Sequence, residues 1–397
     1  MFAYSSRRTV TAGTVSALAL TIALTSAGAQ EINLEQIVVT PNRTPTEESK
    51  VGSTVNVVTQ EQIEKESRPV VIDYLNQIPG ISLASQGGLG KETSLSIRGA
   101  DKKYVKTLFN GIDISDTTAT QVQTSFEHVL ADGITGIEVL KGSQSILYGS
   151  DAVAGVINIS TLPDPDQIGL TQRMLIEGGS NETARGAYAL TNVTDRSRFS
   201  MNIGGLYTGG ISAALVNGVP AVDSSPSSLE DDFYQNVTGS FAGEFQLTDN
   251  FSVFGSGFIV KSKGDFDDSG LPPTDNTLNT GRFDQHAGRV GFNLDLLDGR
   301  FRNTVSVQLV ELDRDVLTVS AFGPFQGNYQ GRRSKLDYQG AFDITDRLTL
   351  QFGGDVEEQR AWITNNFGTN TDDRASIAGL WTQLVAEPVD NLTLSAG

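Results

Sequence analysis

The sequence predicts two folds in one chain: an α+β domain followed by an antiparallel transmembrane β-barrel, of which about ten strands are present. Three observations predict this. A secretory signal stands at the N-terminus, a mixed helix and strand pattern reaches about residue 165, and long stretches of alternating apolar and polar residues fill the rest. Hydrophobic residues make up only 38% of the 397, while glycine is frequent at 42, which is typical of strands that are apolar on one face.

Residues 1–29 have the three parts of a signal peptide. Arg7 and Arg8 supply positive charge, residues 10–24 form an apolar run, and small residues at 27–29 form a cleavage site. The run is shorter than the roughly 20 residues of a spanning helix. We therefore expect export across the inner membrane; a buried N-terminal helix is the alternative.

Charge and composition exclude several classes of function. The net charge of -18 argues against a nucleic-acid partner and against binding anionic lipid by charge. The chain has no cysteine, which excludes disulfides, thiolate metal sites and cysteine nucleophiles. Its two histidines, His128 and His286, lack the spacing of a metal site. We therefore expect no enzyme and no resident cofactor, apart from the calcium site considered below.

The segment from about residue 31 to 165 has the pattern of a compact α+β domain. Short amphipathic stretches alternate with runs of β-branched residues, and Pro79-Gly80 ends one of the helical stretches. The pattern predicts helices over residues 60–66 and 70–77 and strands over residues 55–58, 136–141 and 156–160.

From about residue 168 the sequence alternates without a convincing helix. Alternation with period two places one side chain toward lipid and the next toward the lumen of a barrel. The predicted strands are residues 171–177, 184–194, 199–208, 233–248, 251–263, 283–297, 301–318, 334–345, 348–363 and 375–387, with a last one from residue 392.

The connections between these strands repeat at a near-regular interval. Short turns recur with an aspartate at positions 195, 249, 298, 346 and 390, spaced 54, 49, 48 and 44 residues apart, as expected for one hairpin per repeat. Between them we expect long loops over residues 211–232, 265–282, 320–330 and 364–374. Short turns at one end and long loops at the other are typical of outer-membrane barrels.

A closed barrel is expected because lipid leaves no partner for an unpaired strand edge. A soluble β-sandwich is the alternative. The chain stops at Gly397 inside a strand, and a barrel of about ten strands is too narrow to enclose the preceding domain. We therefore expect this sequence to be part of a larger barrel.

Four stretches resemble the plug domain of TonB-dependent outer-membrane receptors. They are Glu35-Gln36-Ile37-Val38-Val39-Thr40, which resembles the TonB box; Ile97-Arg98-Gly99; Phe109-Asn110-Gly111-Ile112; and Ile137 to Gly142 with Leu147 to Ser150 and Gly155 to Ile159. The resemblance implies a barrel of about 22 strands around a plug. It divides the chain into a signal peptide (1–29), box and linker (30–50), plug (51–165) and partial barrel (166–397).

The order of these motifs is most similar to the cobalamin-receptor branch, and siderophore receptors share much of it. The resemblance implies a receptor in the outer membrane of a Gram-negative bacterium that imports a scarce small-molecule nutrient. Cobalamin is the first expectation and a ferric siderophore the alternative. A passive porin and a soluble exported β-protein are the alternatives from other classes. The implied partners are TonB with its inner-membrane energising proteins and outer-membrane lipid.

The resemblance also implies roles for residues of the plug. Residues 35–40 would bind TonB as an added strand, since extended peptides pair with exposed sheet edges; an ordinary edge strand is the alternative. Arg98 follows an apolar strand, and a buried arginine needs a charged partner. We therefore expect Arg98 and Gly99, with Glu138 and Lys141, to lock the plug to the barrel wall; a purely structural role is the alternative.

Two polar loops of the plug are candidates for substrate contact, because loops rich in glycine or hydroxyls adapt to ligands. Their candidate residues are Ser85, Gln86, Gly87, Leu89, Asp116, Thr117 and Thr118. Solvated turns are the alternative.

An acidic stretch in the second long barrel loop is a candidate calcium site. Carboxylates at Asp265, Asp267, Asp268 and Asp275 supply the oxygen ligands that calcium prefers. The spacing departs from an EF-hand, and a solvated acidic loop is the alternative.

Overall fold

A computed structural model describes residues 37–38, 46–47, 53–211, 231–267, 279–320, 323–389 and 392–397. Residues Gln36–Gly397 form one compact unit, which is described here. The predicted signal peptide, most of the linker and part of the TonB box lie outside the described residues. None of the described helices combines the length and the apolar character needed to cross a membrane.

The plug contains two small sheets and short helices. Its five-stranded sheet has the order β3 (Thr54–Thr59), β9 (Gly136–Lys141), β10 (Gly155–Ser160), β7 (Val105–Phe109) and β8 (Ile112–Asp113). The three-stranded sheet has the order β4 (Ile81–Ser85), β5 (Thr93–Ile97) and β6 (Ala100–Asp101). The helices are α1 (Gln60–Glu66), α2 (Val71–Leu75), η2 (Lys102–Tyr104), η3 (Phe126–His128) and α3 (Ser145–Tyr148).

Local sequence explains where the plug's first helix begins. The Thr59 hydroxyl accepts a hydrogen bond from the Gln62 amide, and the Gln62 side chain accepts one from the Thr59 amide. This capping box satisfies two amides that have no partner inside the helix. The predicted helix over residues 60–66 is confirmed, and the second predicted helix is confirmed in shorter form as α2.

The second part of the chain is one antiparallel sheet of eleven strands, called here the large sheet, with each strand paired to its neighbours in sequence. The expected ten strands and a fragment are confirmed. The strands are β11 (Gly169–Gly179), β12 (Thr183–Thr194), β13 (Ser197–Thr208), β14 (Tyr234–Thr248), β15 (Phe251–Asp265), β16 (Thr280–Leu296), β17 (Phe301–Ser320), β18 (Gly323–Thr345), β19 (Leu348–Asn365), β20 (Asn370–Val389) and β21 (Leu392–Ala396).

Two of the predicted long loops are wrong. Strands β17 and β18 stay paired to Ser320 and Gly323, and β19 and β20 stay paired to Thr364 and Asn370. A strand of 20 residues, such as β17, is longer than a bilayer core at about 3.3 Å per residue. The ends of these strands keep their backbone pairing, while their polar sequence resembles that of a loop.

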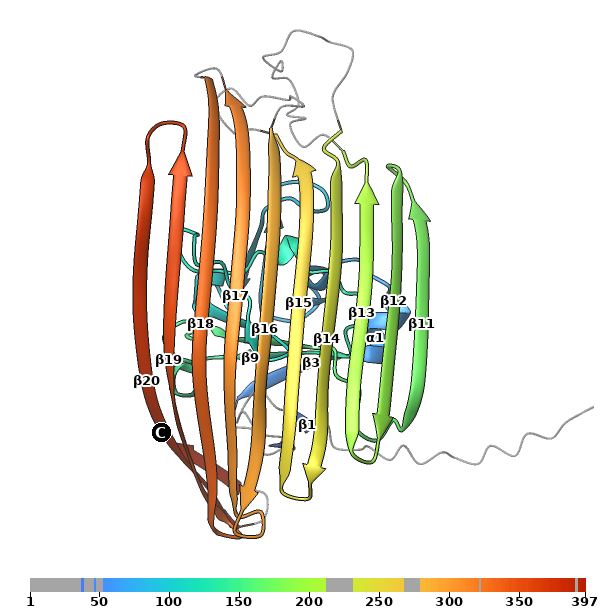
Figure 1. Cartoon of the computed structure of the whole chain (residues 1–397). Coiled ribbons are helices and arrows are strands. Elements are labelled where there is room, and N and C mark those ends of the chain that lie inside the picture. The colour runs from blue at the N-terminus through green and yellow to red at the C-terminus, as the bar shows by residue number, and fades with distance from the viewer. Residues whose placement is uncertain are drawn as a thin grey trace, which may run out of the picture. The chain divides into compact units, whose positions relative to one another are not determined.

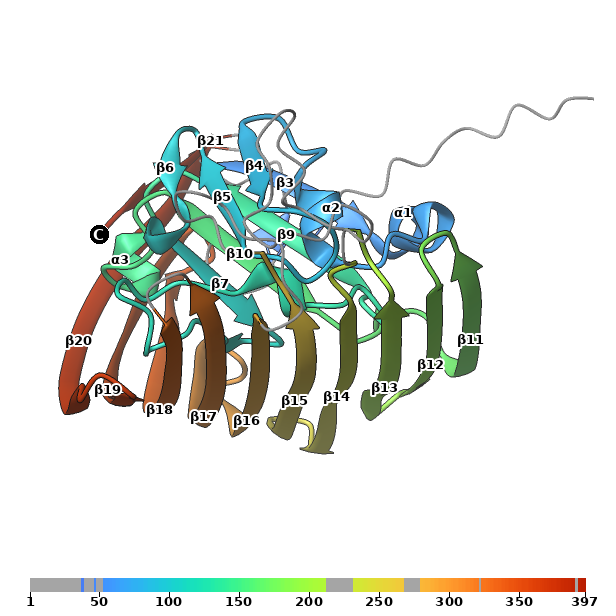
Figure 2. The same ribbon diagram turned by 90° about the horizontal axis from the view of Figure 1, so that it is seen from above.

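The large sheet curves around the plug, which lies on its concave side (Figure 2). The turns from β12 to β13, β14 to β15, β16 to β17 and β18 to β19 lie at one end of the large sheet, called here the turn end, and the opposite end is called the long-loop end (Figure 1). Phe109 of the plug and Phe258 of the large sheet, called the wall where it faces the plug, belong to one continuous apolar cluster. Their rings are stacked with centroids 4.3 Å apart. We call the face toward the plug the inner face and the opposite face the outer face.

The outer face carries large apolar side chains without cover. They include Met201, Ile203, Val237, Phe241, Ile259, Val290, Val307, Leu336, Val356 and Leu380, all exposed. At the turn end, outward aromatic rings cluster in the pairs Phe251–Phe292, Phe301–Phe342, Phe301–Phe352 and Tyr338–Phe352. An apolar band with an aromatic girdle at its edge is the surface that a barrel presents to lipid.

Candidate functional site

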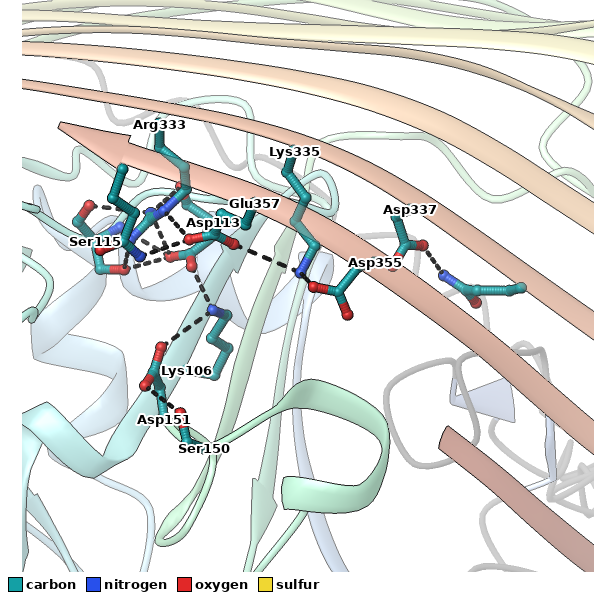
Figure 3. Close-up of polar contacts among 12 residues, drawn as sticks. Lys106, Asp113, Ser115, Ser150, Asp151, Arg333, Lys335, Asp337, Asp355 and Glu357 are labelled. Atoms are coloured by element: carbon teal, nitrogen blue, oxygen red, sulfur yellow. Dashed lines mark hydrogen bonds and ion pairs between the residues drawn. The ribbon is translucent and has the colours of Figure 1, made fainter. Parts of the chain in front are cut away.

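The strongest polar contact between the plug and the large sheet is a buried charge cluster. Arg333 of β18 is 1% exposed and lies 3.2 Å from the carboxylate of Asp113 in the plug and 2.9 Å from that of Glu357 on β19. The Lys106 ammonium of β7 lies 2.5 Å from Asp113. Arg333 also donates hydrogen bonds to the backbone oxygens of Asp113 and Ser115, at 3.1 and 3.2 Å. Figure 3 shows this cluster.

The opposite charges of this cluster stabilise one another against the cost of burial. Burial alone would raise the pKa of Asp113, but the positive charges of Arg333 and Lys106 outweigh burial and hold that pKa well below its usual range. Lys335, two residues along the same face of β18, lies 3.6 Å from Glu357 and continues the network. Because each charge is buried, removing one member would leave another without a partner, which is far more costly than losing an exposed pair.

A second contact joins the large sheet to the plug at β12. Arg185 donates to Asp132 at 2.6 and 3.1 Å, and to the backbone oxygen of Ser67 at 3.1 Å. Both the Arg185 and the Asp132 side chains are almost fully buried. This pair therefore ties the plug to the wall far from the Arg333 cluster in sequence.

A third contact joins η3 of the plug to β14 and β15. The Tyr234 hydroxyl lies 2.9 Å from Nδ1 of His128 and donates to the Glu127 backbone oxygen at 3.2 Å, while Asn236 donates to the His128 backbone oxygen at 3.0 Å. Burial lowers the pKa of His128 to about 3, so the ring is neutral. Burial also raises the pKa of Glu127 to about 7.

Two of the predicted locking residues, Arg98 and Lys141, make their described hydrogen bonds within the plug. Arg98 is exposed rather than buried, has a positive φ of 50°, and donates to Thr54 at 3.4 Å. Lys141 donates to the Pro79 backbone oxygen at 2.6 Å. These described bonds all stay within the plug, so the expectation of a buried Arg98 is wrong. Arg98 and Gly99 instead form a tight turn, whose backbone bends because both residues have positive φ. A locking role for Glu138 stays a prediction.

The two candidate substrate loops differ. Ser85, Gln86 and Gly87 are exposed, and Leu89 is half-buried. The Lys91 ammonium that follows this loop donates to the Asp232 backbone oxygen at 3.2 Å, which places the loop at the long-loop end of β14.

The second loop packs against the wall. Asp116 and Thr118 are buried, and Arg314 of β17 lies 3.8 Å from the Asp116 carboxylate. A Cβ on Gly331 of β18 would come within 2.6 Å of the Thr117 hydroxyl, so the absence of a side chain there admits the loop. The expected open surface at residues 116–118 is therefore closed by the large sheet.

Of the predicted TonB box, only Ile37 and Val38 lie in the described residues. They form β1 (Ile37–Val38), which pairs antiparallel with β2 (Thr46–Glu47). Glu35, Gln36, Val39 and Thr40 lie outside the described residues. These two residues have an extended backbone, and the TonB-binding role of residues 35–40 stays a prediction.

Of the candidate calcium ligands, Asp265 and Asp267 lie in the described residues, and Asp268 and Asp275 lie outside them. Asp265 ends β15, and Asp267 follows it. Across the described ranges, no group of three acidic or histidine side chains is placed to hold a metal ion. The calcium site stays a prediction.

Sequence reasoning missed the residues that join the plug to the sheet. Lys106 interrupts the apolar strand β7, and Arg333 occupies an inward position of β18. A charge inside an apolar strand was a signal that could have found Lys106. Its partners could not be found without the register of the wall strands.

Comparisons with known proteins show what the chain is similar to. A model described as the TonB-dependent receptor plug domain matches residues 47–156. A vitamin B12 transporter of Photobacterium profundum is 27% identical over 368 residues, covering 90% of this chain and 55% of that protein. A vitamin B12 transporter of Vibrio vulnificus is 38% identical over 136 residues, covering 34% of this chain and 22% of that protein.

Solved structures share the fold at low identity. The copper transporter OprC has a TM-score of 0.67 at 14% identity, over 85% of this chain and 53% of its own. The siderophore receptor PirA of Acinetobacter baumannii has a TM-score of 0.63 at 18% identity, over 87% of this chain and 56% of its own. This chain thus spans about half the length of the relatives that it matches throughout. Residues 47–156 thus match the plug domain of TonB-dependent receptors, and 90% of the chain is similar in sequence to a vitamin B12 transporter.

Proposed function

We propose that this chain forms the plug and part of the barrel of an outer-membrane receptor that imports cobalamin with energy delivered by TonB. The similarity to a vitamin B12 transporter over 90% of the chain carries the proposal. The substrate is the finer part of the proposal, because the structural neighbours at 18% identity or below bear on the fold alone.

The two faces of the large sheet support a membrane receptor over the alternatives. A soluble β-protein would not leave Val307 and Leu380 uncovered on the same face as Leu336. A passive porin needs an open lumen, whereas here the inner face is occupied by the plug (Figure 2). Cargo could pass only if the contacts at Arg333 and Arg185 rearranged.

In this proposal, transport is driven by a mechanical pull on the plug. Cargo would bind at the long-loop end, where Ser85 and Gln86 are exposed. The inner-membrane partner would pair with residues 35–40 and pull. Energy must arrive in this way because the outer membrane has no nucleotide supply. The buried ion pairs around Asp113 would then be the contacts that a pull has to break or carry along.

Deleting residues 35–40 tests the role of the box. We expect cobalamin binding to be unchanged and uptake to be abolished, because binding needs the loops and uptake needs the connection to TonB. A control replaces residues 48–52 with glycine and serine. Normal uptake by the deletion variant would refute the role of the box.

The cargo is tested by binding to the purified full-length receptor. We expect cobalamin to bind and ferric chelates not to compete. Binding of a ferric siderophore in place of cobalamin would reassign the receptor to that cargo. Ion conductance by the receptor in a planar bilayer without TonB would instead favour a porin.

We propose calcium as a ligand of the acidic residues at the end of β15. Asp265 and Asp267 would supply two carboxylates, with Asp268 and Asp275 completing the set. Calcium titration followed by calorimetry should show binding that Asp265→Asn with Asp267→Asn weakens. The matched control is Asp195→Asn with Asp249→Asn at the turn end. Equal calcium binding by wild type and variant would remove the site.

A further inference from the structure

The outer face of the large sheet has an open groove near its long-loop end. The groove has a volume of about 740 Å³ and is lined by side chains from β11 to β16. Its residues fall on two neighbouring hydrogen-bonded rows. The lower row is Ile176, Gly186, Gly205, Val237, Lys261 and Asp284, and the upper row is Ala184, Tyr207, Gln235, Lys263 and Arg282.

One end of the groove is apolar and has a floor without side chains. Gly186 and Gly205 lie directly opposite each other on β12 and β13, and Ala184 lies above them. Ile176 and Val237 stand on either side, both exposed. Such a trough can hold a hydrocarbon chain, because small residues let an apolar partner approach the backbone closely.

The other end of the groove is basic. Lys261 and Lys263 lie two residues apart on β15, both exposed, and Lys263 lies directly opposite Arg282 on β16. Like charges directly opposite one another in a sheet repel. Arg282 pairs with Asp284, but no ion pair reaches either lysine from the described part of the chain.

Some outward charges elsewhere on the long-loop edge are paired. On β17 to β20, two outward basic residues pair with outward acids: Arg332 lies 3.8 Å from Glu311, and Arg360 lies 2.7 Å from Asp372. Lys261 and Lys263 have no ion pair among the described residues, and the Lys263 ammonium lies 5.8 Å from the centre of the Phe233 ring, so both can bind an external anion. The net charge of the chain argued against binding anionic lipid, but the local charge of this surface favours it.

The position of Lys261 and Lys263 along β15 fits the level of a lipid headgroup. Lys261 is two residues beyond the lipid-facing Ile259 on the same face of β15, a step of about 7 Å. Tyr207, exposed beside the groove, has the ring and hydroxyl that suit the boundary between lipid and water. Figure 1 shows β12 to β15 side by side across this region.

We propose that this groove binds a phosphate-bearing lipid of the outer leaflet, with its phosphate on Lys261 and Lys263 and an acyl chain on Gly186 and Gly205. The inference rests on the membrane location in the proposed function. It adds a specific lipid site that is separate from the cargo path, because the groove lies on the outer face and the plug lies on the inner face.

The test is native mass spectrometry of the full-length receptor, purified from outer membranes in non-ionic detergent and delipidated. The probe is a bisphosphorylated lipid A-type glycolipid, compared with a phosphatidylethanolamine of matched acyl chains. We expect one glycolipid to bind the wild type in preference to the zwitterionic lipid. Lys261→Gln with Lys263→Gln should weaken glycolipid binding about 25-fold, from about fivefold for each lysine.

The matched control is Arg196→Gln with Arg374→Gln, which removes two exposed positive charges away from the groove and should leave binding unchanged. A second variant, Gly205→Leu, fills the groove and keeps both lysines. It should fold, because a Cβ at Gly205 meets only the Asn236 backbone oxygen at 3.8 Å. We expect it to weaken glycolipid binding as well.

Equal binding by the wild type, the lysine variant and the Gly205→Leu variant would overturn the site. So would full competition by inorganic phosphate alone, which would leave only an anion site. A receptor that fractionates with the outer membrane but binds no glycolipid would overturn this inference and leave the proposed function standing. Recovery of the receptor in the aqueous fraction would overturn the proposed function itself.

Discussion

The two faces of the large sheet differ in which side chains they bury. Charged side chains are buried on the inner face, and large apolar side chains are uncovered on the outer face. On the inner face Arg333 is 1% exposed, held by Asp113 and Glu357. On the outer face Leu380 is 93% exposed, and the neighbouring strands carry further uncovered apolar side chains. In a water-soluble sheet the charged side chain would face out and the apolar one would face in. This arrangement supports the proposed lipid exterior and plug-filled interior.

The charged side chains of the two faces also differ in how strongly they depend on a partner. Inward charges such as Arg333 and Arg185 are buried and bind the plug, so each depends on a specific partner. Outward charges such as Arg332 sit at the edge of the lipid band, where water can replace a lost partner. Adjacent residues of one strand should thus respond very differently to the same substitution.

Arg333→Ala should give the largest effect. It leaves Asp113 and Glu357 buried without the guanidinium that pairs with both, and should lower the free energy of unfolding by about 3–5 kcal/mol. Urea unfolding of the full-length receptor in detergent measures this.

The control is the next residue. Arg332→Ala removes an exposed pair and should cost no more than about 1 kcal/mol. Equal losses from the two variants would mean that the two faces do not differ as described. Partial recovery when Asp113→Asn is added to Arg333→Ala would identify the unpaired carboxylate as the cause.

Val307→Arg tests the outer face. Val307 lies in the middle of the apolar band, so an arginine there should cost about 2–4 kcal/mol in a bilayer. Gln330→Arg, outward and near the long-loop end, should cost about 0–1 kcal/mol. The measurement is unfolding in phospholipid vesicles. If Val307→Arg were harmless in vesicles, the outer face would be in contact with water.

A pH series tests the plug side of the contact at η3. His128 has a pKa near 3 when folded and an ordinary value of 6.5 when unfolded. Stability is therefore lost as the pH falls below 6.5, by about 2 kcal/mol between pH 7 and pH 5. His128→Gln should remove this loss, as measured by the difference between its unfolding curve and that of the wild type.

Glu127 should give stability the opposite dependence on pH. Its pKa is raised to about 7 by burial, from an ordinary value of 4.5, so stability is lost as the pH rises between these values. Glu127→Gln should remove that loss. The two variants should therefore differ from the wild type at opposite ends of the range from pH 5 to pH 7. Parallel curves for both variants would contradict the placement of Glu127 and His128 described here.

Much of the fold could be predicted from local sequence. The capping residues Thr59 and Gln62 fix the start of α1, and period-two alternation marks every strand of the large sheet. The polar ends of β18 and β20 could not be predicted, because strands that leave the lipid lose their apolar face while keeping their backbone pairing.

The site was harder to predict than the fold. Arg333 and Asp113 are 220 residues apart in the chain, and their contact depends on the register of the wall. A shift of one residue would place Arg332 inward instead. Arg98 was expected to be buried because Ile97 before it is apolar, but the chain turns between them. Local sequence reports the periodicity of a strand, not the partner across an interface.

Replacing Arg98 should have the smallest effect on the free energy of unfolding. It tests the expectation that Arg98 locks the plug to the barrel wall. It is exposed, its described bonds stay within the plug, and its positive φ favours glycine. Arg98→Gly loses a long hydrogen bond to Thr54 and relieves the backbone, so the free energy of unfolding should change by less than about 1 kcal/mol. A loss as large as that of Arg333→Ala would mean that Arg98 also holds the plug in the barrel. A small change would assign that role to the buried wall arginines, because the same charge is removed in both variants and only its burial and partners differ.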